Sequence, residues 1–273
     1  MDKPTERLDI GMPVPVGPPP VPTRRPWRVR RTVGRVLLLS GAVFLVWVFV
    51  VLPPPLWYRF QSPRTTAFME LRARQAEREG VAYEARHTPV PLTAVAPVMR
   101  RAVLAGEDHR FYDHAGLDWI EIRRAAGYPR DDFGWLVGGD WADLAGGVWE
   151  SLRGRRPVRG ASTITQQLAK NLYLSPARSI PRKLKEALLA KRLEWTLSKD
   201  RILELYLNHV EFGPGVWGVE AASRTYFNKP ANRLSRQEAA ALAATLPAPL
   251  RSNPAYRPAE MRARQEGILR RMR

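Results

Sequence analysis

The stretch from Ala105 to Gly116, AGEDHRFYDHAG, brings acidic residues, histidines and aromatic residues together. A carboxylate that apolar neighbours partly withdraw from water has a raised pKa, as a general base requires. Glu107 is the candidate for that role, because two aromatic side chains follow it four and five positions later. The alternative is structural: Glu107 or Asp108 caps a helix or pairs with Arg110.

The two histidines of this stretch do not form a zinc pair. His109 and His114 are five positions apart, whereas two zinc ligands on one helix face are separated by four positions. A histidine metal site is therefore not expected here. We interpret His109 and Asp113 as scaffold or surface residues.

The segment from Arg159 to Leu174, RGASTITQQLAKNLYL, predicts a loop followed by a helix. Gly160 and Ser162 suit the loop and the N-cap. One face of the predicted helix carries hydrogen-bonding groups and a single charge, namely Thr163, Gln166, Gln167, Lys170 and Asn171. This composition favours binding of a polar, oxygen-rich ligand, because a solvated face is usually richer in charged residues. An ordinary exposed helix face is the alternative.

Basic residues cluster before one acid in the segment from Ala177 to Asn208. The cations are Arg178, Arg182, Lys183 and Lys185, and the acid is Glu186. In the simplest interpretation, Glu186 pairs with Arg182 four positions earlier. Glu186 can also hold a divalent cation at a diphosphate, with the basic side chains binding the remaining anionic oxygens. The cluster therefore indicates a phosphate-bearing leaving group.

The composition indicates an anionic partner. The 273 residues include 44 Lys and Arg and 26 Asp and Glu, for a formal net charge of +18 at pH 7. Such a balance is typical of proteins that meet nucleic acid, anionic lipid or a phosphate-bearing substrate. The sequence has no cysteine, which excludes disulfides, cysteine zinc sites and cysteine nucleophiles. It also has no zinc-finger, RNP or helix-turn-helix pattern, so nucleic acid is not expected as a partner.

The N-terminal region predicts a membrane anchor. Residues 1–32 form a Pro- and Arg-rich tail, and residues 33–52 form an apolar segment whose one charge is Arg35. This length approaches the roughly 20 residues needed to cross a bilayer core. Because the arginines precede the apolar segment, we expect the tail in the cytoplasm and the rest of the chain outside it. A cleaved signal peptide and a buried core helix are the alternatives.

The remainder is expected to divide into a linker and a mainly α domain. Residues 53–88 predict a linker with a charged juxtamembrane helix, and residues 89–273 a domain that is helical almost throughout from residue 160. Pro97 is expected in the first turn of a helix. No strand-like alternation is recognised. Residues 127–159 are rich in Gly and Trp, and their apolar side chains predict a membrane-seeking surface.

Two separated acids, a polar helix face, a basic cluster and a membrane anchor together indicate glycosyl transfer from a lipid-linked diphosphate. Five ordered motifs carry a family resemblance: EDHRFYDHAG at 107–116, GASTITQQLAKN at 160–171, RKLKEALLAKRLE at 182–194, ILELYLN at 202–208 and FGPGVWGVEAASRTYF at 212–227. On these motifs the chain resembles the monofunctional peptidoglycan glycosyltransferases of glycosyltransferase family 51. The resemblance covers roughly Leu92 to Met272.

The resemblance implies a lysozyme-like, mainly α glycosyltransferase domain with a smaller membrane-associated jaw lobe at about 120–159, preceded by one transmembrane helix. It implies polymerisation of lipid II into β-1,4-linked glycan strands, with inversion and release of undecaprenyl diphosphate. The implied partners are lipid II, the growing glycan strand, membrane lipids and cell-wall synthesis or division proteins. The implied location is the cell inner membrane, single-pass, with a cytoplasmic N-terminus. The motifs S-x-x-K and K-T-G of bifunctional relatives are absent from the sequence, so no transpeptidase domain is expected.

Two acids are carried over by motif position as catalytic residues. Glu107 resembles the general base, which removes the proton from the 4-hydroxyl of the acceptor sugar. Glu186 resembles the second essential acid, near the donor diphosphate and a Mg2+ or Mn2+ ion. Glu186 is therefore also the candidate metal ligand.

Further residues are carried over as substrate contacts or structural parts. The cations that resemble diphosphate ligands are Lys170, Arg178, Arg182 and Lys185. The residues that resemble cleft contacts are Ser162, Thr163, Gln166, Gln167 and Asn171. The residues of the first motif that resemble structural parts are Asp108, Phe111 and His114.

One interval departs from the family pattern. The stretch between GLDW and GAST is longer than the resemblance leads us to expect, and it is rich in Trp and Gly. We expect Trp135, Trp141 and Trp149 to extend the contact of the jaw lobe with the membrane.

Two other functions compete with glycosyl transfer. A lytic glycan-cleaving enzyme would share the lysozyme-like fold and one catalytic glutamate, but it would not need cations for a diphosphate. A non-catalytic membrane scaffold would explain the anchor and the basic charge, but it would not need the two acids.

Overall fold

The computed structural model describes residues 27–51, 55–126, 128, 134, 138–140, 142–143, 146, 162–174 and 179–272. Predictions for the tail at 1–26, for Arg178 and for the three tryptophans of the 127–159 interval lie outside the described residues. The chain forms two compact units, Met1–Leu52 and Pro53–Arg273. Each unit is described by itself.

The first unit contains the helix α1, Trp27–Val51, which covers the predicted apolar segment up to residue 51. A run of Val, Leu and Phe residues without proline allows this helix, and prolines follow at 53–55. Large apolar side chains between Val33 and Phe44 are exposed. Over the part of the chain that the structure describes, no helix combines the length and hydropathy of a bilayer span. The transmembrane helix therefore stays a prediction.

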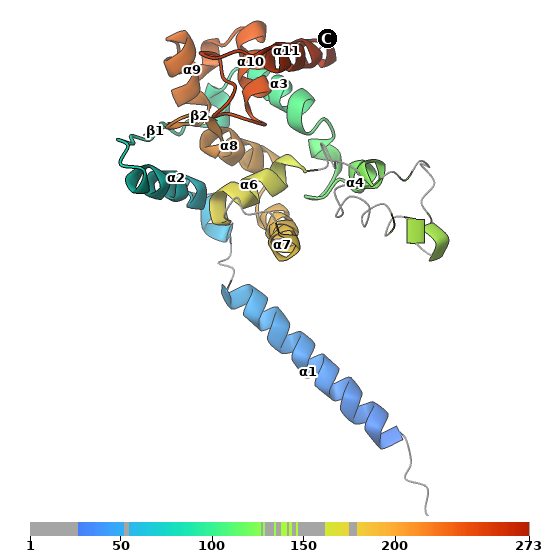
Figure 1. The fold of residues 1–273 in the computed structure, drawn as a ribbon. Helices are drawn as coiled ribbons and strands as arrows, with labels where there is room; N and C mark the ends of the chain where they lie inside the picture. The colour runs from blue at the N-terminus through green and yellow to red at the C-terminus, as the bar shows by residue number, and fades with distance from the viewer. Residues whose placement is uncertain are drawn as a thin grey trace, which may run out of the picture. The chain divides into compact units, whose positions relative to one another are not determined.

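The second unit is mainly α-helical, as expected (Figure 1). Its α-helices are α2 (Ala67–Arg78), α3 (Pro97–Glu107), α4 (Trp119–Ala125), α6 (Ile164–Tyr173), α7 (Ile180–Thr196), α8 (Lys199–His209), α9 (Val219–Phe227), α10 (Arg236–Thr245) and α11 (Ala259–Arg271). Short 3-10 helices lie at Pro55–Arg59, Leu92–Ala94, Phe111–Asp113 and Ala231–Arg233. The charged helix predicted within residues 53–88 is thus α2.

The helix starts are marked by residues with capping chemistry. Pro97 lies in the first turn of α3, as predicted, because proline has no N–H to leave unpaired there. Thr163 and Gln166 form a reciprocal capping box at the start of α6. The N-cap of α6 is therefore Thr163, one residue later than the predicted Ser162.

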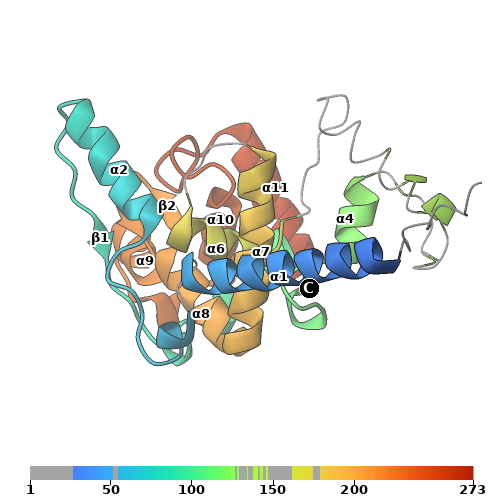
Figure 2. The same ribbon diagram turned by 90° about the horizontal axis from the view of Figure 1, so that it is seen from below.

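The core of the second unit is built around α8 and α10. Every residue from Leu205 to His209 in α8 is buried, and so is every residue from Ala239 to Thr245 in α10. The small alanine side chains of α10 let α3 and α11 pack closely against it. Helix α6 packs against α7, α8 and α2. In both views α2 and α4 lie at opposite ends of the unit (Figures 1 and 2).

A small sheet, which the sequence did not predict, completes the second unit. Strand β3 (Val216–Trp217) pairs with β1 (Arg86–His87) in parallel and with β2 (Glu211–Gly213) in antiparallel fashion. Strands of two or three residues are too short to show an alternating pattern. Gly218 follows β3 with φ = 80°, and a Cβ there would lie 2.4 Å from the carbonyl oxygen of Asn208. Only glycine fits this close approach.

Candidate active site

Helix α3 ends at the candidate base. Glu107 is its last residue, and the backbone leaves the helix at Asp108 with φ = −162° and ψ = 81°. The Asp108 N–H still donates to the carbonyl oxygen of Leu104 at 3.0 Å. The two neighbouring acids therefore have different partners, although they are consecutive in the chain.

Glu107 is held by a chain of two hydrogen bonds. The amide Nε2 of Gln167 donates to Glu107 Oε2 at 2.8 Å, and the hydroxyl of Tyr206 donates to Gln167 Oε1 at 2.9 Å. An ionised carboxylate can only accept hydrogen bonds, so Gln167 must turn its nitrogen toward Glu107 and its oxygen toward Tyr206. Tyr206 is fully buried in α8. It therefore fixes the orientation of the amide that contacts the candidate base.

The surroundings raise the pKa of Glu107 above its ordinary value, and burial is the main cause. The negative charge of Asp108 acts in the same direction. The hydrogen bond from Gln167 opposes the rise, as do the positive charges of Arg264 and Lys170. Among the described residues, Gln167 is the one hydrogen-bond donor to Glu107, and it is neutral. A carboxylate with a raised pKa in such surroundings is suited to take a proton from a substrate hydroxyl.

Asp108 and His114 serve the fold next to this site. Asp108 is buried, its Oδ2 accepts a hydrogen bond from the backbone N–H of Ile164 at 3.0 Å, and His114 Nε2 lies 3.1 Å from both its oxygens. Asp108 thereby ties the end of α3 to the start of α6. Phe111 is also buried, and its ring meets that of His114 edge-on at 6.3 Å. The places of all three residues fit the structural role that the resemblance implies.

Among the described residues, one group could in principle supply three metal ligands. Ligand atoms of Asp108, His114 and Asp118 lie within 4.8 Å of one another. Arg110 Nε already lies 3.3 Å from Asp118 Oδ2, and Asp118 Oδ1 caps α4 through the N–H groups of Ile120 and Glu121. A second cation beside the guanidinium would be repelled. The group is therefore better explained as part of the fold.

Thr163 and Gln166, two predicted cleft contacts, are buried at the start of α6. Thr163 Oγ1 accepts from the Gln166 N–H and lies 2.6 Å from the carbonyl oxygen of Gly116, to which it donates. Gln166 Oε1 accepts from the Thr163 N–H at 3.1 Å. The Thr163 hydroxyl and Gln166 Oε1 are thus occupied within the fold. The pattern Thr-x-x-Gln is itself a capping-box signature that the sequence offered.

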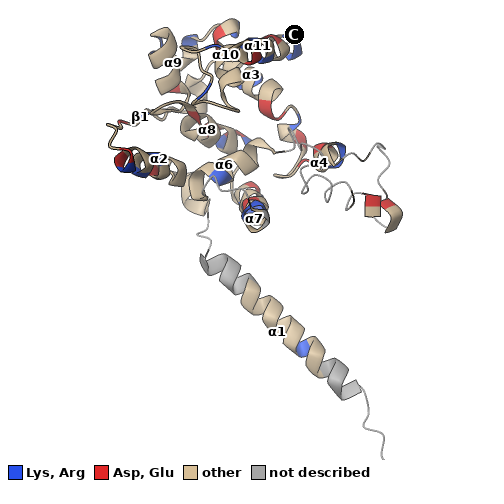
Figure 3. Cartoon of the chain, in the orientation of Figure 1, with Lys and Arg blue, Asp and Glu red and all other residues tan. Residues whose placement is uncertain are grey.

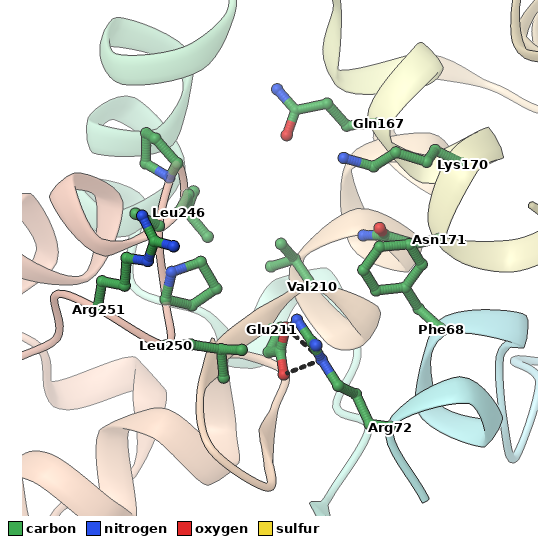
Figure 4. Close-up of a pocket in the computed structure, with 13 residues that line it drawn as sticks. Phe68, Arg72, Gln167, Lys170, Asn171, Val210, Glu211, Leu246, Leu250 and Arg251 are labelled. Atoms are coloured by element: carbon green, nitrogen blue, oxygen red, sulfur yellow. Dashed lines mark hydrogen bonds and ion pairs between the residues drawn. The ribbon is translucent and has the colours of Figure 1, made fainter. Parts of the chain in front are cut away.

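Three other predicted residues of α6 line a cavity of about 580 Å³. Gln167, Lys170 and Asn171 form one wall, and the loop from Leu246 to Arg251 forms the opposite wall (Figure 4). Phe68 and Arg72 of α2, together with Val210 and Glu211, complete the lining. The cavity therefore begins beside the Gln167 amide that contacts Glu107.

Lys170 lies within electrostatic range of both candidate catalytic acids. Burial lowers the pKa of its ammonium, and the positive charges of Lys183 and Arg182 act in the same direction. The negative charges of Glu186 and Glu107 oppose this lowering. Lys170 therefore presents a cation in partly desolvated surroundings, where an anionic ligand group is bound more strongly than in water.

Helix α7 carries both basic and acidic residues (Figure 3), and its Glu186 is buried and contacts two cations of the same helix. Arg182 Nη1 donates to Glu186 Oε2 at 2.6 Å, and Lys183 Nζ donates to Glu186 Oε1 at 2.5 Å. Lys183 also donates to Ser162 Oγ at 2.9 Å. The pairing of Glu186 with Arg182 four positions earlier is confirmed. The buried Arg182 Nε has no hydrogen-bond partner among the described residues.

The side chains around Glu186 do not form a divalent-cation site by themselves. Both oxygens of this carboxylate already accept hydrogen bonds from Arg182 and Lys183. Mg2+ and Mn2+ need several oxygen ligands, and protein sites for them usually share the ion with substrate phosphates. The chain's own residues therefore fit an anion better than a metal ion.

The sequence analysis did not single out Tyr206, Phe68 and Arg72, and it did not foresee one contact of Lys183. Lys183 was visible in the basic cluster, but its contact with Ser162 was not. Tyr206, Phe68 and Arg72 reach the site from α8 and α2. No sequence pattern signals such contacts, because their partners are 39 to 139 residues away. Lys185, which was predicted as a diphosphate ligand, is exposed on α7.

Known proteins resemble the chain over most of its length. Residues 74–129 and 131–273 match the family model for transglycosylases. The biosynthetic peptidoglycan transglycosylase of Azoarcus sp. (strain BH72) is 41% identical over 228 residues, which are 84% of this chain and 89% of that protein. The protein of the same name from Aromatoleum aromaticum is 41% identical over 231 residues, 84% of this chain and 90% of its own. The protein of the same name from Bordetella pertussis is 40% identical over 234 residues, which are 85% of this chain and 88% of that protein.

Proposed function

The chain belongs to the transglycosylase family and polymerises the glycan strands of peptidoglycan, and we propose that it does so from lipid II with Glu107 as general base. The observation that carries this assignment is the chain from Tyr206 through Gln167 to Glu107. It presents one carboxylate with a raised pKa beside a cavity lined by hydrogen-bonding and basic groups. Such a carboxylate can accept a proton from a sugar hydroxyl.

In the proposed reaction Glu107 takes the proton of the acceptor's 4-hydroxyl. The freed oxygen attacks the anomeric carbon of the donor sugar, a new C–O bond forms, and the bond from that carbon to the diphosphate breaks with its electron pair. Attack from the face opposite the leaving group converts an α-linked donor into a β-1,4-linked product. One base and one leaving-group site are sufficient for such an inverting displacement.

The departing undecaprenyl diphosphate carries its negative charge to the basic end of the site. We assign its stabilisation to Lys170 and Arg182, whose buried Nε is a donor without a partner among the described residues. Glu186 keeps Arg182 and Lys183 in place through its two short hydrogen bonds. Preorganised donors of this kind stabilise charge that develops in the transition state. Arg178 and Lys185 remain proposed diphosphate ligands on the strength of the resemblance.

A divalent cation, Mg2+ or Mn2+, remains a proposal that depends on the substrate. The diphosphate would supply its oxygen ligands, and Glu186 is a further candidate ligand only on the strength of the resemblance. When bound, the ion would neutralise charge on the leaving group. The roles given to Glu107, Gln167 and Lys170 do not require it.

The cell envelope is the site of action of a peptidoglycan-synthesising enzyme, and we propose a single-pass location in the inner membrane with a cytoplasmic N-terminus. A continuous helix, α1, and the arginines that precede its apolar part support this topology. Membrane lipids and cell-wall synthesis or division proteins are the proposed partners. A lysozyme-like domain with a membrane-associated jaw lobe remains the proposed fold type. The named relatives are biosynthetic, so nothing favours the lytic alternative.

The test is a polymerisation assay with purified protein in detergent, labelled lipid II and Mg2+. Wild-type protein is expected to form a polymer that lysozyme digests. Glu107→Gln keeps the size of the side chain but removes the base, and its rate should fall by about 10²–10⁴-fold. A Glu107→Gln variant that polymerises at the wild-type rate would remove Glu107 from the mechanism. Wild-type protein that shortens preformed glycan and leaves lipid II intact would restore the lytic alternative.

A further inference from the structure

Helix α2 contributes to the cavity although its first half lies outside the segment that the family model matches. The match begins at residue 74, whereas Phe68 and Arg72 line the cavity beside Lys170 and Asn171. The helix starts at a defined point, because the buried Thr66 side chain accepts a hydrogen bond from the Met69 N–H at 3.2 Å. Its packing against α6 then places Phe68 next to Lys170.

A buried ion pair holds α2 in this position. Arg72 Nη2 donates to Glu211 Oε2 at 3.0 Å, and Arg72 Nε lies 3.1 Å and 3.3 Å from the two carboxylate oxygens (Figure 4). Glu211 is only 5% exposed. A bidentate pair between a guanidinium and a buried carboxylate fixes both position and orientation. The pair therefore joins α2 to β2, which follows α8.

The ring of Phe68 lies close to two cations. The Lys170 ammonium is 5.7 Å from the ring centroid, and the Arg72 guanidinium carbon is 5.9 Å from it. A cation within about 6 Å of an aromatic centroid is attracted by the ring, more strongly where water is excluded. Arg72 is already neutralised by Glu211, so Lys170 is the cation for which the ring matters most.

We propose that Phe68 is a positioning residue, which holds the Lys170 ammonium at the cavity wall where an anionic group of the lipid-linked substrate binds. This inference rests on the proposed function for the identity of the substrate. Across the cavity, the exposed Arg251 faces Lys170 (Figure 4). The anionic group is thus expected between two cations, of which one is held by an aromatic ring and one is exposed.

Packing alone is the competing explanation, and two variants separate it from the proposal. Phe68→Leu keeps an apolar side chain but removes the ring. Phe68→Tyr keeps the ring and serves as the matched control. If the ring acts through Lys170, Phe68→Leu must weaken substrate binding and Phe68→Tyr must not. When Lys170 is replaced by Met, Phe68→Leu must have no further effect.

The experiment measures two quantities on the full-length protein in detergent: kcat/KM with lipid II, and the affinity for inorganic diphosphate by calorimetry. For Phe68→Leu we expect both to fall about threefold to fivefold, and for Phe68→Tyr both to stay within about twofold of wild type. In a Lys170→Met background, Phe68→Leu is expected to cause no further loss. Thermal melting confirms that each variant is folded.

The outcomes distinguish this inference from the proposed function. Wild-type affinity for diphosphate in Phe68→Leu overturns the positioning role, whatever Glu107→Gln does to polymerisation. An equal loss in Phe68→Leu with and without Lys170 also overturns it, because the effect would then be packing. Diphosphate binding that depends on the ring, in a protein that does not polymerise lipid II, upholds the inference and rejects the proposed function.

Discussion

Glu107 and Glu186 are the same side chain in opposite surroundings. Glu107 accepts one neutral hydrogen bond, from Gln167, and burial raises its pKa. Glu186 accepts two charged hydrogen bonds, from Arg182 and Lys183. The first arrangement favours uptake of a proton, and the second fixes the positions of two cations. The partners of an acid, and not its residue type, thus determine its part in the reaction.

One helix supports both surroundings. Gln167 of α6 reaches Glu107, and Lys170, three residues later on the same face, feels the charges of both Glu107 and Glu186. The amide that contacts the base and one of the cations assigned to the leaving group are therefore less than one turn of α6 apart. A substitution at the start of α6 should therefore alter the surroundings of both acids, whereas a substitution next to one acid should alter the surroundings of that acid alone.

The largest expected contrast is in stability. Glu186→Gln leaves Arg182 and Lys183 without their buried counter-charge, and we expect the free energy of unfolding to fall by about 2–3 kcal/mol, less than for a fully buried pair because Lys183 is half-exposed. Glu107→Gln removes a partly buried charge that forms no ion pair with the described residues, so stability should stay the same or rise. Chemical denaturation of both variants measures the difference. Equal losses would show that the two surroundings do not differ energetically.

The next effect concerns the helix that both acids share. Thr163→Ala removes the acceptor for the Gln166 N–H and the donor to Gly116, and should lower the free energy of unfolding by about 1–2 kcal/mol. Because α6 carries both Gln167 and Lys170, polymerisation should fall as well. Thr163→Ser keeps the hydroxyl and is the control. A Thr163→Ala protein with wild-type stability would contradict the capping role.

A smaller effect is expected on the pH dependence of the base. Glu107 must be ionised to act, so activity is lost as the pH falls through its raised pKa, at a higher pH than for an ordinary carboxyl. Tyr206→Phe releases the Gln167 amide, weakens its hydrogen bond to Glu107, and should move this acidic limb to still higher pH. On the acidic limb, where the rate follows the ionised fraction of Glu107, a loss of about fivefold is expected, from about 1 kcal/mol for one hydrogen bond.

Rate measurements across pH test this relay. Arg264, Lys170 and Asp108, the other charges that act on Glu107, are unchanged in Tyr206→Phe. Gln167→Met is expected to shift the acidic limb in the same direction, and adding Tyr206→Phe to it should have little further effect. Full additivity of the two shifts would show that Tyr206 does not act through Gln167.

The smallest effect separates two neighbouring lysines. Lys183 contacts Glu186 and Ser162, whereas Lys185 is exposed. Lys185→Met should change the free energy of unfolding by less than about 0.5 kcal/mol, and Lys183→Met by about 1 kcal/mol. If Lys185 contacts only substrate, its replacement raises the KM for lipid II without altering stability. An unchanged KM would remove Lys185 from the diphosphate site.

The sequence predicted those features that depend on local chemistry. Pro97 marked the start of α3, and the two acids could be singled out because each stands in a distinctive local setting. The capping role of Thr163 and Gln166 was also readable from their spacing, but their position in a polar motif favoured a ligand-binding interpretation.

Features that depend on contacts between distant segments could not be predicted. Tyr206 and Phe68 look like ordinary core aromatics in the sequence, and their roles arise only when α8 and α2 pack against α6. Strand β1 is equally unreadable, because its partners in β3 lie more than a hundred positions away in the chain. Strands β2 and β3 are neighbours in the sequence, but with two or three residues each they are too short to show an alternating pattern.

The end of α3 at Glu107 constrains how this enzyme can change. Glu107 faces Gln167 because it is the last helical residue, and Asp108 turns to His114 because the helix has ended. Each residue of an α-helix is rotated by about 100° from the one before it. An insertion or deletion of one residue within α3 would bring the wrong acid to the substrate or neither. Exposed positions of α3 can therefore accept substitutions, while the number of its residues cannot vary.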